Sequence, residues 1–347
     1  MAETASGKKI RVLSLDGGPS STTYVYLLQD IVNQNPAFLS KIDVIAGNSD
    51  GAFLAMYLAT RPKEAFDPAN AQATVADMIA FCRNFFDACE PCMPGLGYLR
   101  LFSGLASYAS ERGVEKFLNN AYGSSSTLRD LPSGKRVVMP TYRITGSPPD
   151  TVIQSNIGER SHWDVSPTYA ALRSGSFPVL FPLQNGHLDG GVFANNPALC
   201  ALSQLIQEEG GERMKDIVVF SLGADAASWG RCVNHALKGK DLAKWGWIQW
   251  LFGAGQPLLL GTVLLDAMQR GVSTQMKGFI GDRYLRVTAP IGEGIFWQLL
   301  EYVLRLQDLM FWQGKRASAA WVDGKAKNFQ PSYTDTIAWL DKHWYTP

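Results

Sequence analysis

The chain has 347 residues, of which 46% are hydrophobic and 18% are charged, a composition typical of a folded globular protein with a sizeable core. Its net charge of +1 argues against a nucleic-acid partner, because such a partner favours a strongly basic protein face. The sequence shows neither an apolar run long enough to span a membrane nor a signal peptide, so we expect a cytoplasmic protein or one bound peripherally to a membrane.

The first predicted strand, Lys9–Leu15, alternates apolar and polar residues. It ends on a turn with two adjacent glycines, Asp16–Thr23, and the next residues, Tyr24–Val32, have the apolar spacing of a helix. The backbone amides of Gly17 and Gly18 are compatible with an oxyanion hole, a phosphate cradle or a simple turn. A dinucleotide-binding fingerprint is disfavoured, because the turn does not have its glycine spacing.

The second predicted strand, Ile42–Ile45, leads into a sharp turn at Gly47–Gly51, and the Ala-, Leu- and Met-rich run that follows is typical of a helix. Ser49 occupies the centre of this turn, and the flanking glycines relieve the crowding there. The pattern predicts a nucleophile elbow, with the Ser49 hydroxyl beside the N-terminus of the helix, where negative charge is favoured. The alternative is an ordinary turn between a strand and a helix.

A strand–helix–strand unit of this length requires two parallel strands joined by a right-handed connection. Both glycine turns then lie at the same carboxyl edge of the sheet. The amides of Gly17 and Gly18 can therefore face Ser49 across a short gap.

Residues Phe66–Tyr122 are predicted to be mainly helical, interrupted by a stretch rich in Gly, Pro and aromatic residues, Cys89–Ser110, which is typical of a loop near a site. The odd number of cysteines argues against a disulfide framework. One pair has Cys-x-x-Cys spacing, but no second ligand pair accompanies it, and we expect neither a metal nor a cofactor. The five cysteines are Cys82, Cys89, Cys92, Cys200 and Cys232.

Asp189 is the second candidate catalytic residue, because it precedes two glycines that allow its loop to approach another loop closely. An aspartate in an ordinary Asp-Gly turn is the more common alternative. The remaining predicted elements are a hairpin of strands at Lys135–Ile144 and Thr151–Ser155, helices at Val165–Arg173 and Pro197–Glu208, a buried strand at Asp216–Gly223, an edge strand at Tyr284–Val287 and a helix at Ile295–Phe311.

In this order and spacing the motifs resemble those of the patatin-like phospholipases, a family of serine-aspartate lipid acyl hydrolases. The family has a glycine-rich loop, a Gly-x-Ser-x-Gly elbow and an Asp-Gly-Gly motif, which match Asp16–Gly18, Gly47–Gly51 and Asp189–Gly191. Residues Val192–Ala198 are close to the family's usual continuation. The resemblance extends from Lys9 to about Pro290.

The resemblance implies a three-layer α/β/α fold with a mostly parallel central sheet. We expect a flexible tail at residues 1–8 and a single domain over residues 9–347, because no repeat or low-complexity tract divides the chain. The last part of this domain, from about residue 295 to residue 347, is expected to form a helical cover.

The resemblance also implies a mechanism. Ser49 attacks the carbonyl carbon of a lipid ester while Asp189 accepts the proton, and an acyl-enzyme forms. The amides of Gly17, Gly18 and Asp50 stabilise the oxyanion. The implied partner is a lipid ester substrate at a membrane surface, without nucleic acid, while the sequence leaves the oligomeric state open.

The first loop departs from the family pattern. Pro19 replaces a glycine and has no N–H, so an oxyanion donor is lost at that position. Ser21 stands where the family has a cation, and Thr22 replaces a further glycine. The alternative hypothesis is therefore a catalytically impaired relative that binds lipid or protein.

A Ser-Asp-His triad is the rival arrangement, because His235 and His343 follow Asp189 in the sequence. Neither lies in a segment typical of a catalytic loop, and we expect both to be surface or packed histidines. The tryptophans Trp245, Trp247 and Trp250 are candidates for a lipid-facing surface, although tryptophans at helical spacing more often belong to a core.

Overall fold

The computed structural model describes residues 8–18, 21–89, 107–123, 127–158, 162–224, 238, 244–253, 258–289, 300, 306–326 and 329–347. Most of the predicted loop Cys89–Ser110 lies outside these residues, as do Pro19, Cys92, Cys232 and His235.

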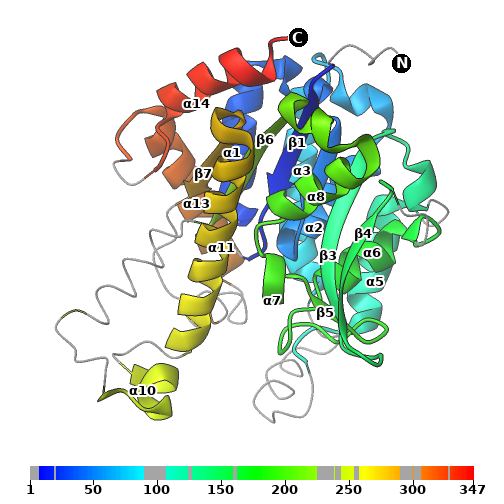
Figure 1. The fold of residues 1–347 in the computed structure, drawn as a ribbon, viewed down its shortest axis with the longest axis vertical. Coiled ribbons are helices and arrows are strands. Elements are labelled where there is room, and N and C mark those ends of the chain that lie inside the picture. The colour runs from blue at the N-terminus through cyan, green and yellow to red at the C-terminus, as the bar shows by residue number, and fades with distance from the viewer. Residues whose placement is uncertain are drawn as a thin grey trace.

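One mixed, mostly parallel sheet forms the centre of an α/β fold (Figure 1). Its strands, in spatial order, are β4 (Asp150–Ser155), β3 (Arg136–Arg143), β2 (Val44–Gly47), β1 (Ile10–Leu15), β6 (Ile217–Ala224) and β7 (Tyr284–Ala289), while β5 (His187–Asp189) pairs with β3 outside this order. The pairs from β3 to β7 are parallel, and β4 and β5 run antiparallel to β3. The predicted hairpin and the late edge strand are confirmed.

The α-helices are α1 (Ser21–Gln34), α2 (Asp50–Ala59), α3 (Ala71–Ala88), α5 (Glu111–Tyr122), α6 (Pro167–Ser174), α7 (Gly191–Ala194), α8 (Ala198–Glu209), α10 (Trp247–Phe252), α11 (Leu259–Ile280), α13 (Gln307–Val322) and α14 (Tyr333–Trp339). Short helical turns are η1 (Pro36–Lys41), η2 (Lys63–Phe66), η3 (Leu128–Asp130), η5 (Gly211–Asp216), η8 (Gly281–Arg283) and the π-helical η9 (Leu340–Trp344).

Alternate residues of the central strands face two separate hydrophobic cores. On one face of the sheet, Leu13 and Phe220 pack with apolar side chains of α1, α2, α3 and α13. On the other face, Val12 and Val219 pack with α8 and with the C-terminal part of α11. The sheet is therefore the middle of three layers, and the predicted α/β/α fold class is confirmed.

Several predicted boundaries were wrong. The helix predicted from Tyr24 begins at Ser21, inside the predicted glycine turn. The strand predicted from Ile42 begins at Val44, because the Ile42 amide closes the preceding turn by donating to the Leu39 carbonyl at 3.2 Å. Most of the helix predicted over Ile295–Phe311 lies outside the described residues, and α13 begins only at Gln307 and continues to Val322. The helix α13 continues through Gly314. This glycine allows α13 to pack closely on α1, because a Cβ at residue 314 would lie 2.2 Å from the Thr22 carbonyl oxygen.

The C-terminal helices share their core with the sheet. Phe311, Trp321 and Trp344 belong to the same buried cluster as Leu13, and Arg11 Nε donates to the Trp344 carbonyl at 2.6 Å. These contacts fit the single domain with a helical cover, which stays a prediction. In the described ranges we find no helix with the length and apolar character needed to cross a membrane.

Candidate active site

Ser49 lies at the turn between β2 and α2, in a backbone conformation that few residues adopt, with φ 53° and ψ −125°. The flanking glycines are required by close backbone contacts. A Cβ on Gly47 would lie 2.3 Å from the Gly51 carbonyl oxygen, and a Cβ on Gly51 would lie 2.2 Å from the Leu15 carbonyl oxygen. A strained serine held between two crowded glycines has the geometry of a nucleophile elbow.

Asp189 ends β5 and is fully buried. Its Oδ1 accepts hydrogen bonds from the Gly191 amide at 2.6 Å and from Asn48 Nδ2 at 3.3 Å. Its Oδ2 is buried and accepts no hydrogen bond of ordinary geometry among the described residues. One carboxyl oxygen is thus anchored, while the other stays available to a nearby hydroxyl.

Burial raises the pKa of Asp189 from 3.8 to about 6, and hydrogen bonding to the Ser49 side chain, the Gly191 amide and Asn48 partly offsets this effect. The Ser49 hydroxyl is therefore close enough to act on the carboxyl group, although the contact falls short of a well-formed hydrogen bond. The structure thus brings together the two residues whose interaction the sequence interpretation requires.

Two asparagines join the loops of the site, and the sequence analysis assigned them no role. Asn48 Nδ2 donates to Asp189 Oδ1 and to Asn195 Oδ1, both at 3.3 Å. Asn195 Nδ2 in turn donates to the Gly17 carbonyl at 3.4 Å. Both asparagines occur inside motifs that the sequence analysis identified, but their function depends on distances that a sequence does not give.

The glycine loop after β1 lies against the nucleophile, because a Cβ on Gly17 would lie 2.8 Å from the Ser49 Cβ. The Gly17 amide, however, already donates to the Asn195 carbonyl at 3.2 Å. Gly18 has a positive φ of 98°, and the Asp50 amide is the first of α2, so its own helix offers it no acceptor. The Gly17 amide is thus engaged in this structure, and the assignment of Gly17, Gly18 and Asp50 as oxyanion donors stays a prediction.

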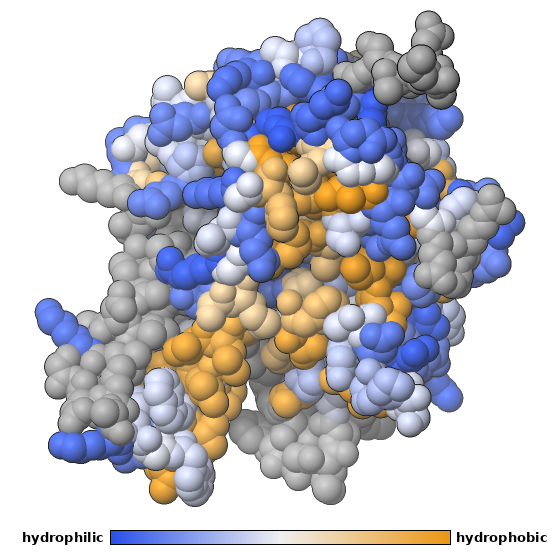
Figure 2. All heavy atoms as spheres, viewed as in Figure 1, coloured by the Kyte–Doolittle hydropathy of each residue, from blue (hydrophilic) through white to orange (hydrophobic). Residues whose placement is uncertain are grey.

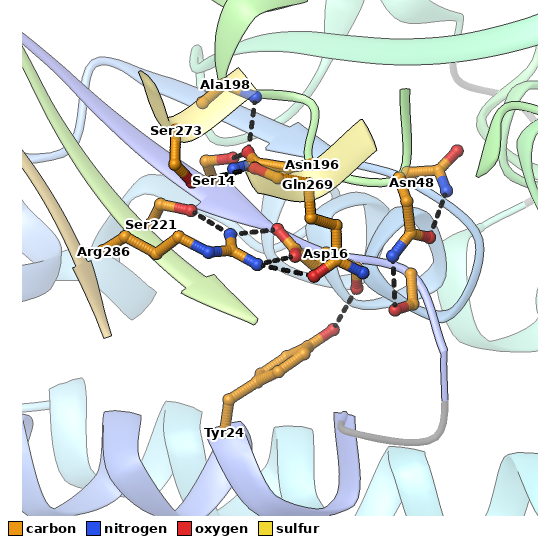
Figure 3. A network of polar contacts seen from close by, with 12 residues as sticks. Ser14, Asp16, Tyr24, Asn48, Asn196, Ala198, Ser221, Gln269, Ser273 and Arg286 are labelled. Carbon is orange, nitrogen blue, oxygen red and sulfur yellow. Dashed lines mark hydrogen bonds and ion pairs between the residues drawn. The ribbon is translucent and has the colours of Figure 1, made fainter. Parts of the chain in front are cut away.

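A buried ion pair fixes the start of the glycine loop (Figure 3). Arg286 on β7 donates to Asp16 Oδ1 at 3.0 Å and to Oδ2 at 2.5 Å. The same guanidinium group contacts Ser221 Oγ and Gln269 Oε1, each at 3.0 Å. The sequence analysis placed residue 286 in a late strand but did not predict this role.

The rival triad gains no support from the described histidines. His343 Nε2 lies 3.5 Å from Asp282, and its ring packs on Trp339. His187 is buried, and burial together with nearby arginines lowers its pKa to about 4, which makes it a poor base. Within the described ranges, no three His, Cys, Asp or Glu side chains are grouped so that they could hold a metal ion.

The tryptophans were candidates for a lipid-facing surface, and the alternative of core packing is wrong for α10, in which no residue is buried. Trp247 is 69% exposed, and Ile248 and Phe252 are also exposed, while Trp245 and Trp250 are half-buried and pack edge to face at 5.4 Å. Figure 2 shows apolar side chains along the part of α11 that leads to α10. The short helix packs beside α11 with an apolar face left uncovered.

No family model matches the chain. The chain is 28% identical to Patatin-like protein 2 of Oryza sativa over 284 residues, which cover 73% of this chain and 69% of that protein. It is 24% identical to Patatin-like protein 1 of Arabidopsis thaliana over 329 residues, which cover 83% and 76% of the two chains.

Among solved structures, the chain is similar to ExoU of Pseudomonas aeruginosa, crystallised with SpcU, with a TM-score of 0.37 and 13% identity over 96% of this chain and 58% of ExoU. It is also similar to VipD of Legionella pneumophila, with a TM-score of 0.34 and 13% identity over 98% and 80% of the two chains. At such TM-scores the shapes differ too much for the likeness to bear on function.

Proposed function

We propose that this chain, a member of the patatin-like protein family, is a serine esterase that hydrolyses acyl esters of lipids through Ser49 and Asp189. The observation that supports the proposal most is that buried Asp189 Oδ2 has no hydrogen bond of ordinary geometry among the described residues and lies close to the hydroxyl of a serine on a strained elbow. A buried oxygen without a hydrogen bond is costly, and such cost is typical of functional sites.

In the proposed reaction the Ser49 hydroxyl oxygen forms a bond to the ester carbonyl carbon, and its proton passes to Asp189. The tetrahedral intermediate collapses as the alcohol leaves and takes the proton back from Asp189. Water then attacks the acyl-enzyme in the same way, so that the fatty acid is released and Ser49 recovers its proton. No redox partner is needed for either half of the reaction.

The environment of Asp189 compensates in part for the absence of a histidine. A carboxylate with a pKa of about 6 binds a proton about a hundred times more tightly than one with the ordinary value of 3.8. General-base catalysis gains from a pKa nearer to the working pH. The amides of Gly18 and Asp50 are the proposed donors to the oxyanion, each worth about 10²–10³ in rate.

A second candidate function is binding without efficient catalysis. It is favoured by the engagement of the Gly17 amide with Asn195 and by Pro19, which has no amide hydrogen. Both features reduce the number of oxyanion donors. In this case the protein binds a lipid or protein ligand without hydrolysing an ester.

The proposed partner is a lipid surface, which Trp245, Trp247 and Trp250 would meet through α10. Aromatic side chains with one polar edge favour the interface between water and a bilayer. The exposed Ile248 and Phe252 extend the same face, and Lys244 lies exposed next to it, where anionic headgroups would attract it.

Hydrolysis of a soluble chromogenic acyl ester by three proteins tests the proposal. We expect Ser49→Ala to lower kcat/KM to the background rate, and Asp189→Asn to lower it at least about 10²-fold, because the base is lost. Ser110→Ala, a substitution at the start of α5, is the matched control and should keep the full rate. Equal rates in the wild type and both dyad variants would reject hydrolysis by Ser49 and Asp189.

A further inference from the structure

Asp50 follows the nucleophile and begins α2, and its amide is one of the proposed oxyanion donors. Its side chain lines a small cavity of about 10 Å³ together with apolar side chains of α2 and α3: Phe53, Leu54, Phe81, Phe85 and Phe86. Among the described residues, its one side-chain hydrogen bond comes from Ser21 Oγ, at 3.5 Å from Oδ2. A carboxyl group thus faces an apolar cavity next to the reacting serine.

No cation of the described residues forms an ion pair with Asp50. The charge of Asp16 is balanced by its ion pair with Arg286. Burial raises the pKa of the Tyr24 phenol and of the Cys82 thiol, so both groups stay uncharged near neutral pH. Among the described residues, the titratable groups that interact with Asp50 are Asp189 at the end of β5, Tyr24 on α1 and Cys82 on α3, while Asp16 after β1 interacts with Tyr24.

Burial, and then repulsion by Asp189, raises the pKa of Asp50 to about 7, whereas that of Asp189 is about 6. The two carboxyl groups therefore titrate as a coupled pair. Between the two titration steps the pair carries one negative charge, and we expect Asp189 to hold it, because the Gly191 amide and Asn48 stabilise its ionised form, while Asp50 keeps its proton. Both groups carry a negative charge only above this range.

Ionisation of Asp50 opposes the proposed reaction in two ways. A second negative charge beside Ser49 repels the oxyanion that develops on the substrate. The ionised carboxylate also weakens the positive potential at the N-terminus of α2, which favours the oxyanion beside the Asp50 amide. We propose that the reaction proceeds while the Asp50 carboxyl group is uncharged, so that Asp50 sets the alkaline limit of the activity, an inference that rests on the proposed esterase function.

The pH profile of kcat/KM in wild type and Asp50→Asn tests this inference, because asparagine has the same shape and stays uncharged at every pH. We expect the wild-type value to rise with an apparent pKa of about 6 and to fall above about 7, by about 30-fold at about pH 8.5. In Asp50→Asn the alkaline fall should disappear while the acid limb remains. The exposed Asp67 offers a control, since Asp67→Asn should keep both limbs.

The titration of the Asp50 carboxyl carbon by ¹³C NMR gives a readout without turnover, with the resonance assigned by its loss in Asp50→Asn. We expect it to titrate near pH 7, and titration below about pH 5 would overturn the inference. An alkaline fall that persists in Asp50→Asn would reject the role of Asp50 but leave the proposed esterase function standing. Absence of hydrolysis at every pH would instead reject the proposed esterase function, and the alkaline limit with it.

Discussion

At the scale of single residues, the chemistry depends on the asymmetry of Asp189. Oδ1 is held by the Gly191 amide and by Asn48, while Oδ2 is buried without a hydrogen bond in the described part of the molecule. A carboxyl group with both oxygens bonded would be a weaker base, because hydrogen bonds stabilise its ionised form. The unsatisfied oxygen lowers stability and supplies basicity.

The cost to stability is measurable through its pH dependence. The folded protein binds the Asp189 proton more tightly than the unfolded chain, since burial raises the pKa from 3.8 to about 6. Protonation of Asp189 therefore contributes roughly 3 kcal/mol to the free energy of unfolding below about pH 4. This contribution is lost as pH rises through about 6. We expect Asp189→Asn to gain stability relative to wild type between about pH 4 and pH 7.5, as measured by denaturant unfolding.

Asp335→Asn, at an exposed site near the start of α14, is the control for this titration and should follow the wild-type pH dependence. A stability difference between Asp189→Asn and wild type that stays constant with pH would mean that Asp189 titrates normally in the folded protein.

Sequence reasoning identifies residues whose function follows from local geometry. Ser49 between Gly47 and Gly51 predicts its turn, because the crowding involves neighbours in the chain. The roles of Asn48 and Asn195 were not predictable, since each depends on which loops the fold brings within hydrogen-bond distance.

At the scale of elements, the site is built where strand ends meet. β1 and β2 are parallel, so the glycine loop and the elbow leave the sheet at the same edge, as the sequence predicted. Asp189 is positioned differently: β5 pairs with β3 in an antiparallel arrangement, and Asp189 lies opposite Thr141. No residue pattern predicted this three-residue strand, and only the Asp-Gly-Gly motif indicated its aspartate.

Close packing of the elbow against β1 leads to a stability prediction. Gly51→Ala should lower the free energy of unfolding by more than about 2 kcal/mol, because the new Cβ meets the Leu15 carbonyl oxygen. Gly271→Ala on α11 is the matched control: its Cβ meets nothing within 4 Å, and alanine favours a helix by about 0.5–1 kcal/mol. Urea unfolding of both variants measures the difference, and similar effects from the two would argue against a tightly packed elbow.

The ion pair between Arg286 and Asp16 shows the limit of prediction at this scale. The two residues are separated by 270 positions, and strand patterning alone does not indicate which side chains meet across a sheet. Arg286 nevertheless holds Asp16, the residue that begins the glycine loop, through a buried ion pair.

At the scale of the whole molecule, the exposed apolar side chains of α10 decide between two interpretations of the tryptophan spacing. Core packing was the more common alternative to a lipid-facing surface, but α10 has no buried residue and contacts α11. Periodicity gives the face of a helix and not what covers it. The three-layer fold, by contrast, was predicted through the resemblance to the patatin-like family, and the parallel pairing of its first two strands followed from the strand–helix–strand pattern.

Binding to lipid vesicles tests the proposed role of this face. The double variant Trp247→Ser and Phe252→Ser should bind vesicles of zwitterionic and anionic phospholipid at least about tenfold more weakly in a flotation assay, because two exposed anchors are lost. Trp312→Ser is the control and should bind vesicles as the wild type does, because it removes an exposed tryptophan, 56% exposed, from α13 and not from α10. Equal binding of the double variant and the wild type would exclude α10 as the contact.

Labelling by a fluorophosphonate tests the central claim most directly, because this probe reacts with a serine only where a neighbouring base activates it. We expect one adduct, located at Ser49 by peptide mass analysis, and labelling at least about 10²-fold slower in Asp189→Asn. An unlabelled Ser49, or equal labelling of Ser49 in wild type and Asp189→Asn, would contradict this claim.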